Sequence, residues 1–575
     1  MLKRIFSYMK QYKKYAYLAL VCIGIEVVLE LMVPMLMADL IDNGVANADI
    51  PYIYTKGIQM GGCAILALIL GIGSSKFSAL AGQGLGANIR MAEYEKLQSY
   101  SFSNIDHFRV SSLVTRLTSD VTNIQNSVST GMRPFGRSPV MLIVATSVAF
   151  SINSTLALVF LVALPVLAAM LIAIIVHIRP LYSKMQNAID LVNRTVGENL
   201  TAIRVVKAYV RGGYEIEKFE KVNENLKNQS ESAFKSSVLN MPAMQLVMYS
   251  TILGILLLGG HLIKAGELGI GQLTSFLSYV LLILNSLMMM SNVFMMMTRS
   301  LVSGARIMEV LDEKIDITDE LARDISVEHG EIEFDHVWFK YKEEAEEYVL
   351  SDISFHIRPG QTVGIIGQTG SAKTTLVQLI PRLYDVSRGV VKVDGVDVKE
   401  YPMRHLRDAI AMVLQKNTLF SGSLLSNLKW GNEDAAMEEI EEACHIACVD
   451  EFIDRLSDGY DTEMGQGGVN VSGGQKQRIC IARAILKKPK VLILDDSTSA
   501  VDTATEAKLR EGLARKLPDM TKIVIAQRIS SVRHADQIII LDKGKVNGIG
   551  THESLLASNK IYQEIYESQK EGADL

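Results

Sequence analysis

Long apolar stretches dominate the first 300 residues of the chain. Six of them approach the length of about 20 residues that a helix needs to cross the hydrocarbon core of a bilayer. They lie near residues 16–38, 57–80, 135–151, 154–178, 241–263 and 272–297. Only the uncharged turn Ile152-Asn153-Ser154 separates the third stretch from the fourth. The pattern therefore predicts six membrane-spanning helices, two of which form a tight hairpin.

Charged and periodic segments extend two of the connections between these spans. Residues 87–128 and 184–235 are poor in glycine and proline and have the spacing of amphipathic helices. We expect them to continue the spans as helices beyond the membrane. Each is interrupted once, at residues 103–108 and 212–215. These breaks are candidates for short crosswise helices, and the alternative is a plain hairpin turn.

The pattern changes after about residue 320. Short runs of β-branched residues, glycine turns and amphipathic helices follow one another, which is typical of an α/β domain. We therefore divide the chain into an α-helical membrane domain with six spans, residues 1–320, and an α/β domain, residues 321–575.

Composition and charge support this division. The 575 residues are 49% hydrophobic, which excludes a disordered chain. Residues 1–300 carry 25 Lys and Arg against 17 Asp and Glu, whereas residues 301–575 carry 33 against 46. This split favours a basic region at a lipid surface over nucleic-acid binding. The first 15 residues hold five basic residues and no acid, so the positive-inside rule places both termini in the cytoplasm.

The strongest chemical motif spans residues 367–374, after a strand-like run and before a helical one. It is nearly a P-loop, whose backbone N–H groups bind phosphates. Lys373 is expected to contact the β- and γ-phosphates, and Thr374 to bind Mg²⁺. Ala372 replaces a usual glycine, and its methyl group is expected to crowd the loop. The motif predicts ATP and Mg²⁺ as cofactors, with these residues in contact with the nucleotide: Gly367, Gly370, Ser371, Lys373, Thr374 and Thr375.

Two further segments point to phosphate chemistry. A hydrophobic strand at residues 491–494 ends in Asp495 and Asp496, which is a pattern that holds nucleotide-bound Mg²⁺. Ser472-Gly473-Gly474-Gln475 opens a helix, so its exposed amides face an anion. A second phosphate-facing surface in the same domain suggests a dimer.

Taken together and in this order, the motifs resemble those of a half-transporter of the ATP-binding cassette (ABC) exporter superfamily, over nearly the full length. The resemblance implies an ATP-hydrolysing transporter that works by alternating access. It implies that Tyr341 stacks on adenine and that Gln415 and Asp495 serve the Mg²⁺ site. Residues 472–475 are then the signature and residues 499–502 the D-loop. The breaks near Ile105 and Tyr214 are then coupling helices.

Two positions depart from the family pattern. Asp496 stands where a glutamate normally polarises the attacking water, and Gln527 replaces a histidine that contacts the γ-phosphate. A shorter carboxylate positions water poorly, so we expect slow hydrolysis at the site of Asp496, Gln527 and Gln415. Because the signature is intact, the resemblance implies the degenerate-site subunit of a heterodimer. Hydrolysis is then expected mainly at the site that the partner's Walker motifs form.

The cargo is the most open question. Glu26 and Glu30 share one face of the first span, which indicates contact with a cationic substrate, hydrogen bonding between helices or a water-lined cleft without ligand contact. Methionines at 288–290 and 295–297, with Met289 and Met296 as candidates, suit either varied apolar substrates or ordinary packing. We expect export of amphipathic or cationic small molecules across a bacterial plasma membrane. The alternatives are a lipid or peptide exporter and a nucleotide-gated channel or regulatory ABC protein.

Overall fold

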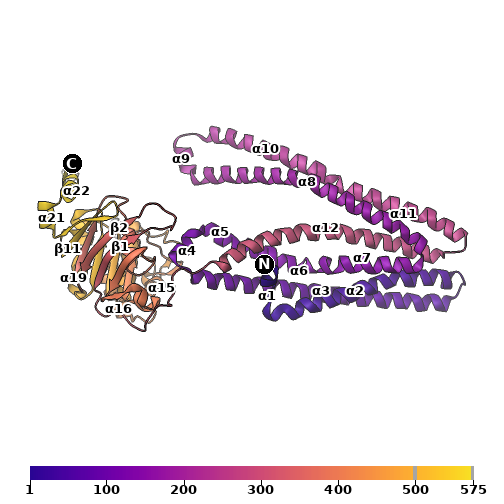
Figure 1. The fold of residues 1–575 in the computed structure, drawn as a ribbon, viewed down its shortest axis with the longest axis horizontal. Helices are drawn as coiled ribbons and strands as arrows, with labels where there is room; N and C mark the ends of the chain where they lie inside the picture. Colours follow the sequence, from indigo (N-terminus) through magenta and orange to yellow (C-terminus); the bar gives the residue numbers. More distant parts are fainter. Residues whose placement is uncertain (497–500, 572–575) are drawn as a thin grey trace. The chain divides into compact units, whose positions relative to one another are not determined.

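Figure 1 shows the computed structural model of the chain, which describes residues 1–496 and 501–571. The chain forms two compact units. The first comprises Met1–Gln98 and Val110–Glu313, and the second comprises Ser99–Arg109 and Lys314–Leu575. A short segment between two helices of the first unit thus belongs to the second.

The first unit is entirely helical. Among the described residues, six helices are long and apolar enough to cross a membrane, which confirms the predicted number of spans. The spans lie in α2 (Lys13–Asp39), α3 (Ile50–Gln98), α7 (Met132–Ile152), α8 (Ser154–Thr201), α11 (Asn240–Lys264) and α12 (Ile270–Asp312). Short elements accompany them: α1 (Leu2–Ser7), η1 (Lys10–Tyr12) and the π-helical turn η2 (Leu40–Val45). The Asn153 side chain caps α8 by accepting a bond of 2.9 Å from the Leu156 amide.

Apolar side chains fill the space between these helices and also cover much of their outer surface. Ile23, Val27, Phe160, Phe276 and Tyr279 are buried in one cluster. Many other large apolar side chains of the spans are exposed, as expected for helices surrounded by lipid.

Helices continue beyond the spans, as the sequence predicts. In the first extension, α3 is followed by α4 (Phe102–His107), α5 (Val110–Thr115), the π-helical turn η3 (Arg116–Asp120) and α6 (Val121–Ser129). The second consists of the end of α8, α9 (Ile203–Ala208) and α10 (Gly212–Val238). Figure 1 shows α8 and α10 side by side, joined by α9.

The two breaks differ in how well the sequence located them. Helix α4 lies where a short helix is expected. The second expectation, near Tyr214, is wrong: the short helix is α9, and Tyr214 lies in the first turn of α10. The chain turns instead at Val210, whose φ of +53° is in the left-handed region. Gly212 and Gly213 begin a helix, so the glycine pair marked a helix start rather than the turn.

The second unit contains a six-stranded sheet in the order β12-β11-β3-β10-β9-β6. Its strands are parallel except for β12, which pairs antiparallel with β11. They are β3 (Thr362–Ile366), β6 (Ile410–Val413), β9 (Val491–Asp495), β10 (Thr521–Ile525), β11 (Gln537–Asp542) and β12 (Lys545–Gly550). Since β3, β9, β10 and β11 are almost wholly buried, their continuous apolar runs follow from cover on both faces.

A smaller antiparallel sheet and short helices complete the unit and confirm the predicted α/β class. The sheet has the order β2-β1-β4-β5, with β1 (Ile332–Phe339), β2 (Leu350–Ile357), β4 (Arg388–Val393) and β5 (Val396–Asp397). Strands β7 (Gly422–Ser423) and β8 (Glu463–Met464) pair separately. The helices are α13 (Lys373–Gln378), η4 (Val398–Glu400), α14 (Met403–Ala409), α15 (Leu424–Leu428), α16 (Met437–Ile446), α17 (Asp450–Ile453), η5 (Gly459–Asp461), α18 (Gly473–Leu486), α19 (Thr503–Lys516), α20 (Ile529–Val532), α21 (His552–Ser558) and α22 (Lys560–Glu571).

Candidate functional site

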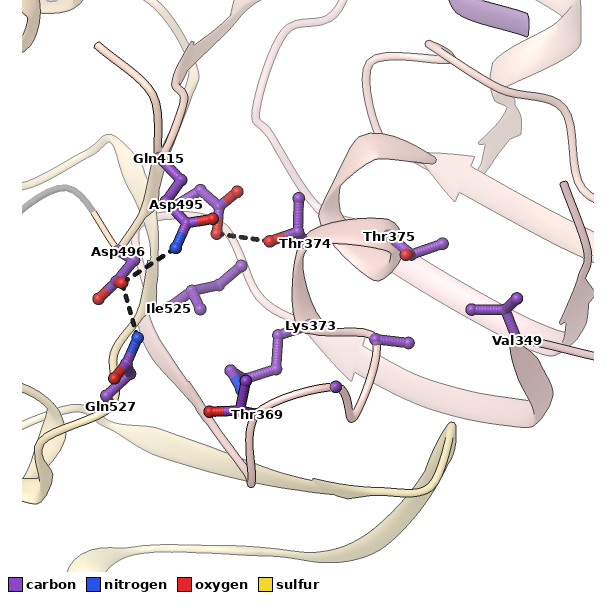
Figure 2. Close-up of a pocket in the computed structure, with 12 residues that line it drawn as sticks. Val349, Thr369, Lys373, Thr374, Thr375, Gln415, Asp495, Asp496, Ile525 and Gln527 are labelled. Atoms are coloured by element: carbon purple, nitrogen blue, oxygen red, sulfur yellow. Dashed lines mark hydrogen bonds between the residues drawn. The ribbon is translucent and has the colours of Figure 1, made fainter. Parts of the chain in front are cut away.

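The candidate nucleotide residues gather at one edge of the six-stranded sheet. β3 ends at Ile366 just before the P-loop, β9 ends at Asp495, and β10 ends at Ile525. Gln415 follows the end of β6, which lies beside β9. Because the carboxyl ends of parallel strands meet at the same edge, four distant segments converge. Figure 2 shows their side chains around a cavity of about 320 Å³.

The loop between β3 and α13 has the features of a phosphate cradle. A Cβ atom at Gly367 would lie 2.1 Å from the carbonyl oxygen of Leu541, so a side chain does not fit there. Gly370 has a φ of +86° and faces open space. The Ser371 hydroxyl is buried and makes no hydrogen bond to another described residue. These residues therefore fit a bound phosphate, which would accept hydrogen bonds from the loop.

Lys373 is the first residue of α13 and lines the cavity. Its Nζ atom donates to the carbonyl oxygens of Gly367 at 2.8 Å and Gln368 at 2.9 Å. Burial lowers the pKa of this ammonium group, and the nearby Asp496 and Asp495 carboxylates oppose that shift. A half-buried cation at the start of a helix fits the charge of nucleotide phosphates.

Ala372 affects the loop in a way that the sequence did not indicate. It precedes α13 with φ +72° and ψ +27°, in the left-handed region. Its side chain packs against the core beneath the smaller sheet. A left-handed conformation costs an alanine about 1 kcal/mol that glycine does not lose. The departure from glycine thus acts mainly through backbone strain.

Thr374 and Asp495 form a site suited to a hard cation. The Thr374 hydroxyl donates to the Asp495 carboxylate at 3.0 Å. Burial raises the pKa of Asp495, and this hydrogen bond partly offsets the shift. No group of three or more His, Cys, Asp and Glu suited to a metal occurs among the described residues. These oxygen atoms therefore fit a Mg²⁺ ion that also binds phosphates and water.

The three candidate catalytic residues lie together (Figure 2). One carboxylate oxygen of Asp496 accepts a hydrogen bond from the Gln527 amide at 2.8 Å and a longer one from the Gln415 amide at 3.4 Å. Asp496 itself has a φ of +48°. A carboxylate oxygen that accepts from two amides is a weaker acceptor for the proton of a water molecule.

Tyr341 connects the nucleotide cavity to α4, all within the second unit. Its hydroxyl group lies 2.8 Å from that of Thr375, which lines the cavity, and its ring remains 45% exposed. The ring of Tyr384 packs edge-on against it, with centroids 5.2 Å apart. The Tyr384 hydroxyl in turn donates to Asp106 of α4 at 2.6 Å. Burial raises the pKa of Tyr384, so the hydroxyl stays a donor. Sequence reasoning missed Asp106 and Tyr384 because only the fold brings them together.

The signature residues form a capped helix start. The Ser472 hydroxyl accepts from the Gln475 amide nitrogen at 3.3 Å, and the Gln475 side chain accepts from the Ser472 amide nitrogen at 2.9 Å. Ser472 and Gly473 are exposed. The residues that line the P-loop cavity do not include Ser472, Gly473, Gly474 or Gln475. Within this chain, therefore, the two phosphate-facing surfaces do not meet in that cavity.

The D-loop is described only in part. Ser499 and Ala500 lie outside the described residues. Val501 is buried, and Asp502 caps α19 by accepting from the Thr505 amide at 3.0 Å. The two described residues thus lead directly into a capped helix.

In the first unit, Glu26 and Glu30 are paired with arginines of α7. Glu26 lies 2.6 Å from Arg133 and 3.4 Å from Arg137, and Glu30 lies 2.6 Å from Arg137. Glu26 is buried. The sequence does contain a signal for these partners, because Arg133 and Arg137 are four residues apart, like the two glutamates. The ion pairs compensate the charges that a cationic substrate would otherwise meet.

The methionine candidates have different positions. Met289 is exposed, whereas Met296 lines a cavity of about 420 Å³ that lies wholly within the first unit. The side chain of Met295 lies outside the described part of the structure.

Comparisons with known proteins agree with these observations. Residues 17–287 match the ABC transporter transmembrane region, and residues 350–499 match the ABC transporter family. An uncharacterized ABC transporter ATP-binding protein of Bacillus subtilis, YfiB, is 38% identical over the full length of both chains. An ATP-dependent lipid A-core flippase of Desulfotalea psychrophila is 32% identical over 85% of each chain.

A solved structure supports the same fold. The chain of a bacterial Atm1-family ABC exporter with ATP bound superposes with a TM-score of 0.83. The match covers 97% of this chain and 99% of that chain at 22% identity. Six apolar spans followed by a P-loop α/β domain, matched over full length by ABC relatives, identify the chain as a member of the ABC transporter family with the ABC exporter fold.

Proposed function

We propose that this chain is one subunit of a heterodimeric ABC exporter that moves amphipathic small molecules out of the cell, and that its own ATP site binds nucleotide but hydrolyses it slowly. The observation that carries the proposal is the position of Asp496. Its carboxylate is shorter than a glutamate, and the amides of Gln527 and Gln415 already occupy one of its oxygens.

The remaining residues of the site are suited to binding. The P-loop amides and Lys373 would bind the phosphates, and Thr374 with Asp495 would hold the cation, since Lys373, Thr374 and Asp495 line one cavity and Thr374 donates a hydrogen bond to Asp495. Bound ATP with Mg²⁺ supplies the phosphoryl group whose transfer to water drives an exporter. Gln527 can donate a hydrogen bond to a γ-phosphate but brings no positive charge, so it orients the phosphate without stabilising developing charge as well as an imidazolium would.

A second subunit completes both sites in this proposal. The start of α18 is exposed, and its residues do not line the P-loop cavity of this chain. If this helix N-terminus binds a phosphate, the phosphate must therefore belong to a nucleotide that another chain binds. The long arm of α8, α9 and α10 also exposes large apolar side chains, among them Val205, Tyr209 and Tyr214. Such a surface supports docking of a partner.

The direction of insertion and the cargo are part of the proposal. The basic N-terminal segment supports cytoplasmic termini in a bacterial plasma membrane. The arginine partners of Glu26 and Glu30 support a structural role for these carboxylates, so amphipathic compounds suit the membrane unit better than cations do. A lipid is the second candidate cargo, because several relatives are lipid A-core flippases.

Purification of the tagged chain from its own cells tests the heterodimer. We expect a one-to-one complex with a second ABC half-transporter that carries the catalytic glutamate and histidine. A stable homodimer with full ATPase activity would refute this part of the proposal.

A transport assay in proteoliposomes tests the cargo. Replacing both Glu26 and Glu30 with Gln should reduce the transport of cationic and neutral amphipathic dyes equally. A selective loss for the cationic dye would instead show that the carboxylates contact the cargo. Transport of a fluorescent phospholipid, without any dye, would favour the lipid alternative.

A further inference from the structure

A further cavity lies in the first unit, between the N-terminal segment and the helices α2, α6, α7 and α12. It has a volume of about 420 Å³ and is bordered by the N-terminal residues, the first turns of α2, the junction of α6 and α7, and the part of α12 around Met297. Phe6, Met9, Ala16, Val128 and Met296 are among the side chains that line it. This volume is within the range of small-molecule sites, and the lining is mostly apolar.

The cavity has a buried floor and an open, apolar mouth. Met9 and Val128 are buried, whereas Tyr17 and Phe135 are 69% and 54% exposed. Aromatic side chains of this kind are typical of the boundary between lipid and water. The opening therefore lies within reach of a bilayer surface, at the N-terminal end of α2.

One of the side chains that line this apolar cavity carries a positive charge. Lys13 lines the cavity and is exposed. No carboxylate of the described residues forms an ion pair with it. By contrast, Arg4 is paired with Asp312, and Lys14 lies over the ring of Tyr15 with its Nζ 5.1 Å from the centroid. Lys13 is thus free to bind an anion at the edge of an apolar cavity.

We propose that this cavity binds one anionic phospholipid of the cytoplasmic leaflet, with an acyl chain among the apolar side chains and the phosphate beside Lys13. The leaflet assignment rests on the proposed orientation of the chain. An anionic headgroup matches Lys13, the lysine that lines the cavity, and one lysine beside an anionic lipid contributes about fivefold in affinity. The lipid is a resident ligand and not the exported compound.

Lipid retention tests the proposal without reference to transport. The full complex is placed in nanodiscs of phosphatidylcholine mixed with phosphatidylglycerol, and the lipids that remain after detergent washing are quantified by mass spectrometry. We expect enrichment of phosphatidylglycerol, and a reduction of about fivefold in Lys13→Gln. The control Lys14→Gln should retain the lipid. Equal losses in the two variants, or equal retention of both lipids by the unchanged protein, would overturn the proposal.

A second pair of variants tests the apolar part. Ala16→Phe fills the cavity and should abolish retention, whereas Leu18→Phe changes an exposed side chain of the same helix that does not line the cavity. Undiminished retention in Ala16→Phe would mean that the lipid binds elsewhere or that a second subunit covers the cavity, and would overturn the proposal. Because none of these readouts depends on ATP hydrolysis or on transport, they can fail while the proposed export function stands.

Discussion

The P-loop and the N-terminus of α18 both have backbone N–H groups that are suited to bind an anion, yet their side chains have different surroundings. The cavity contains a strained Ala372 and an Asp496 engaged by amides. The start of α18 keeps its reciprocal cap between Ser472 and Gln475. The P-loop cavity thus keeps the groups suited to phosphate binding although its catalytic groups differ from the family pattern. The start of α18, which is proposed to serve the partner's nucleotide, keeps its capped helix start.

This difference has a physical reason. Phosphate binding depends mainly on loop amides, a lysine and a cation, which Asp496 and Gln527 do not supply. Stabilising a transition state requires preorganised donors at fixed positions, and a small displacement is costly. The proposed division of labour between two subunits predicts unequal effects of mutations at the two surfaces.

The largest effect is expected at the start of α18. Gly474→Asp places a carboxylate where a phosphate must approach, so the steady-state ATPase rate of the purified complex should fall by about 100-fold or more. Gly197→Asp is the control, since Gly197 lies in α8 and faces open space. Full activity of Gly474→Asp would mean that the signature of this chain serves no working site.

The next largest effect is expected at Tyr384, which links the nucleotide cavity to α4. Tyr384→Phe removes a hydrogen bond to the charged Asp106, worth about 2 kcal/mol, so transport per ATP hydrolysed should fall by up to about 30-fold. Tyr348→Phe is the control because its ring packs on Trp338 instead. An unchanged ratio of transport to ATP hydrolysis in Tyr384→Phe would show that this hydrogen bond does not couple α4 to the nucleotide site.

A smaller effect is expected from relieving strain in the loop. Ala372→Gly removes the left-handed alanine and should raise the free energy of unfolding by about 1 kcal/mol. The expected readouts are a higher melting temperature and tighter ATP binding. Ala514→Gly, in the exposed part of α19, should destabilise by a similar amount. A lower melting temperature for Ala372→Gly would show that the methyl contacts outweigh the strain.

The smallest effect is expected at Asp496 itself. If this carboxylate activates little water, Asp496→Asn should change the ATPase rate of the complex by less than about threefold, whereas loss of a working general base costs about 100-fold or more. The partner's catalytic glutamate, replaced by glutamine, is the matched control and should abolish turnover. A near-total loss from Asp496→Asn would make Asp496 a working base and contradict the degenerate-site hypothesis.

Local patterns of the sequence determined much of this protein. Apolar runs of sufficient length predict spans wherever they lie, because every backbone group in a membrane must be satisfied within the helix. The six spans, the α/β class and the family were therefore accessible without coordinates. The P-loop was also accessible, since its residues are contiguous. The position of α9 was not, because Gly212 and Gly213 fit a turn and a helix start equally well.

Only the tertiary structure decided how separate segments meet. The pairing of Glu26 and Glu30 with Arg133 and Arg137 joins two helices. The bond from Gln527 to Asp496 joins the ends of neighbouring strands. Each such contact depends on packing between elements far apart in the chain, and a sequence pattern records only which side chains each element can offer. The sequence thus determined the elements and their chemistry, and packing determined which charges are compensated and which remain available.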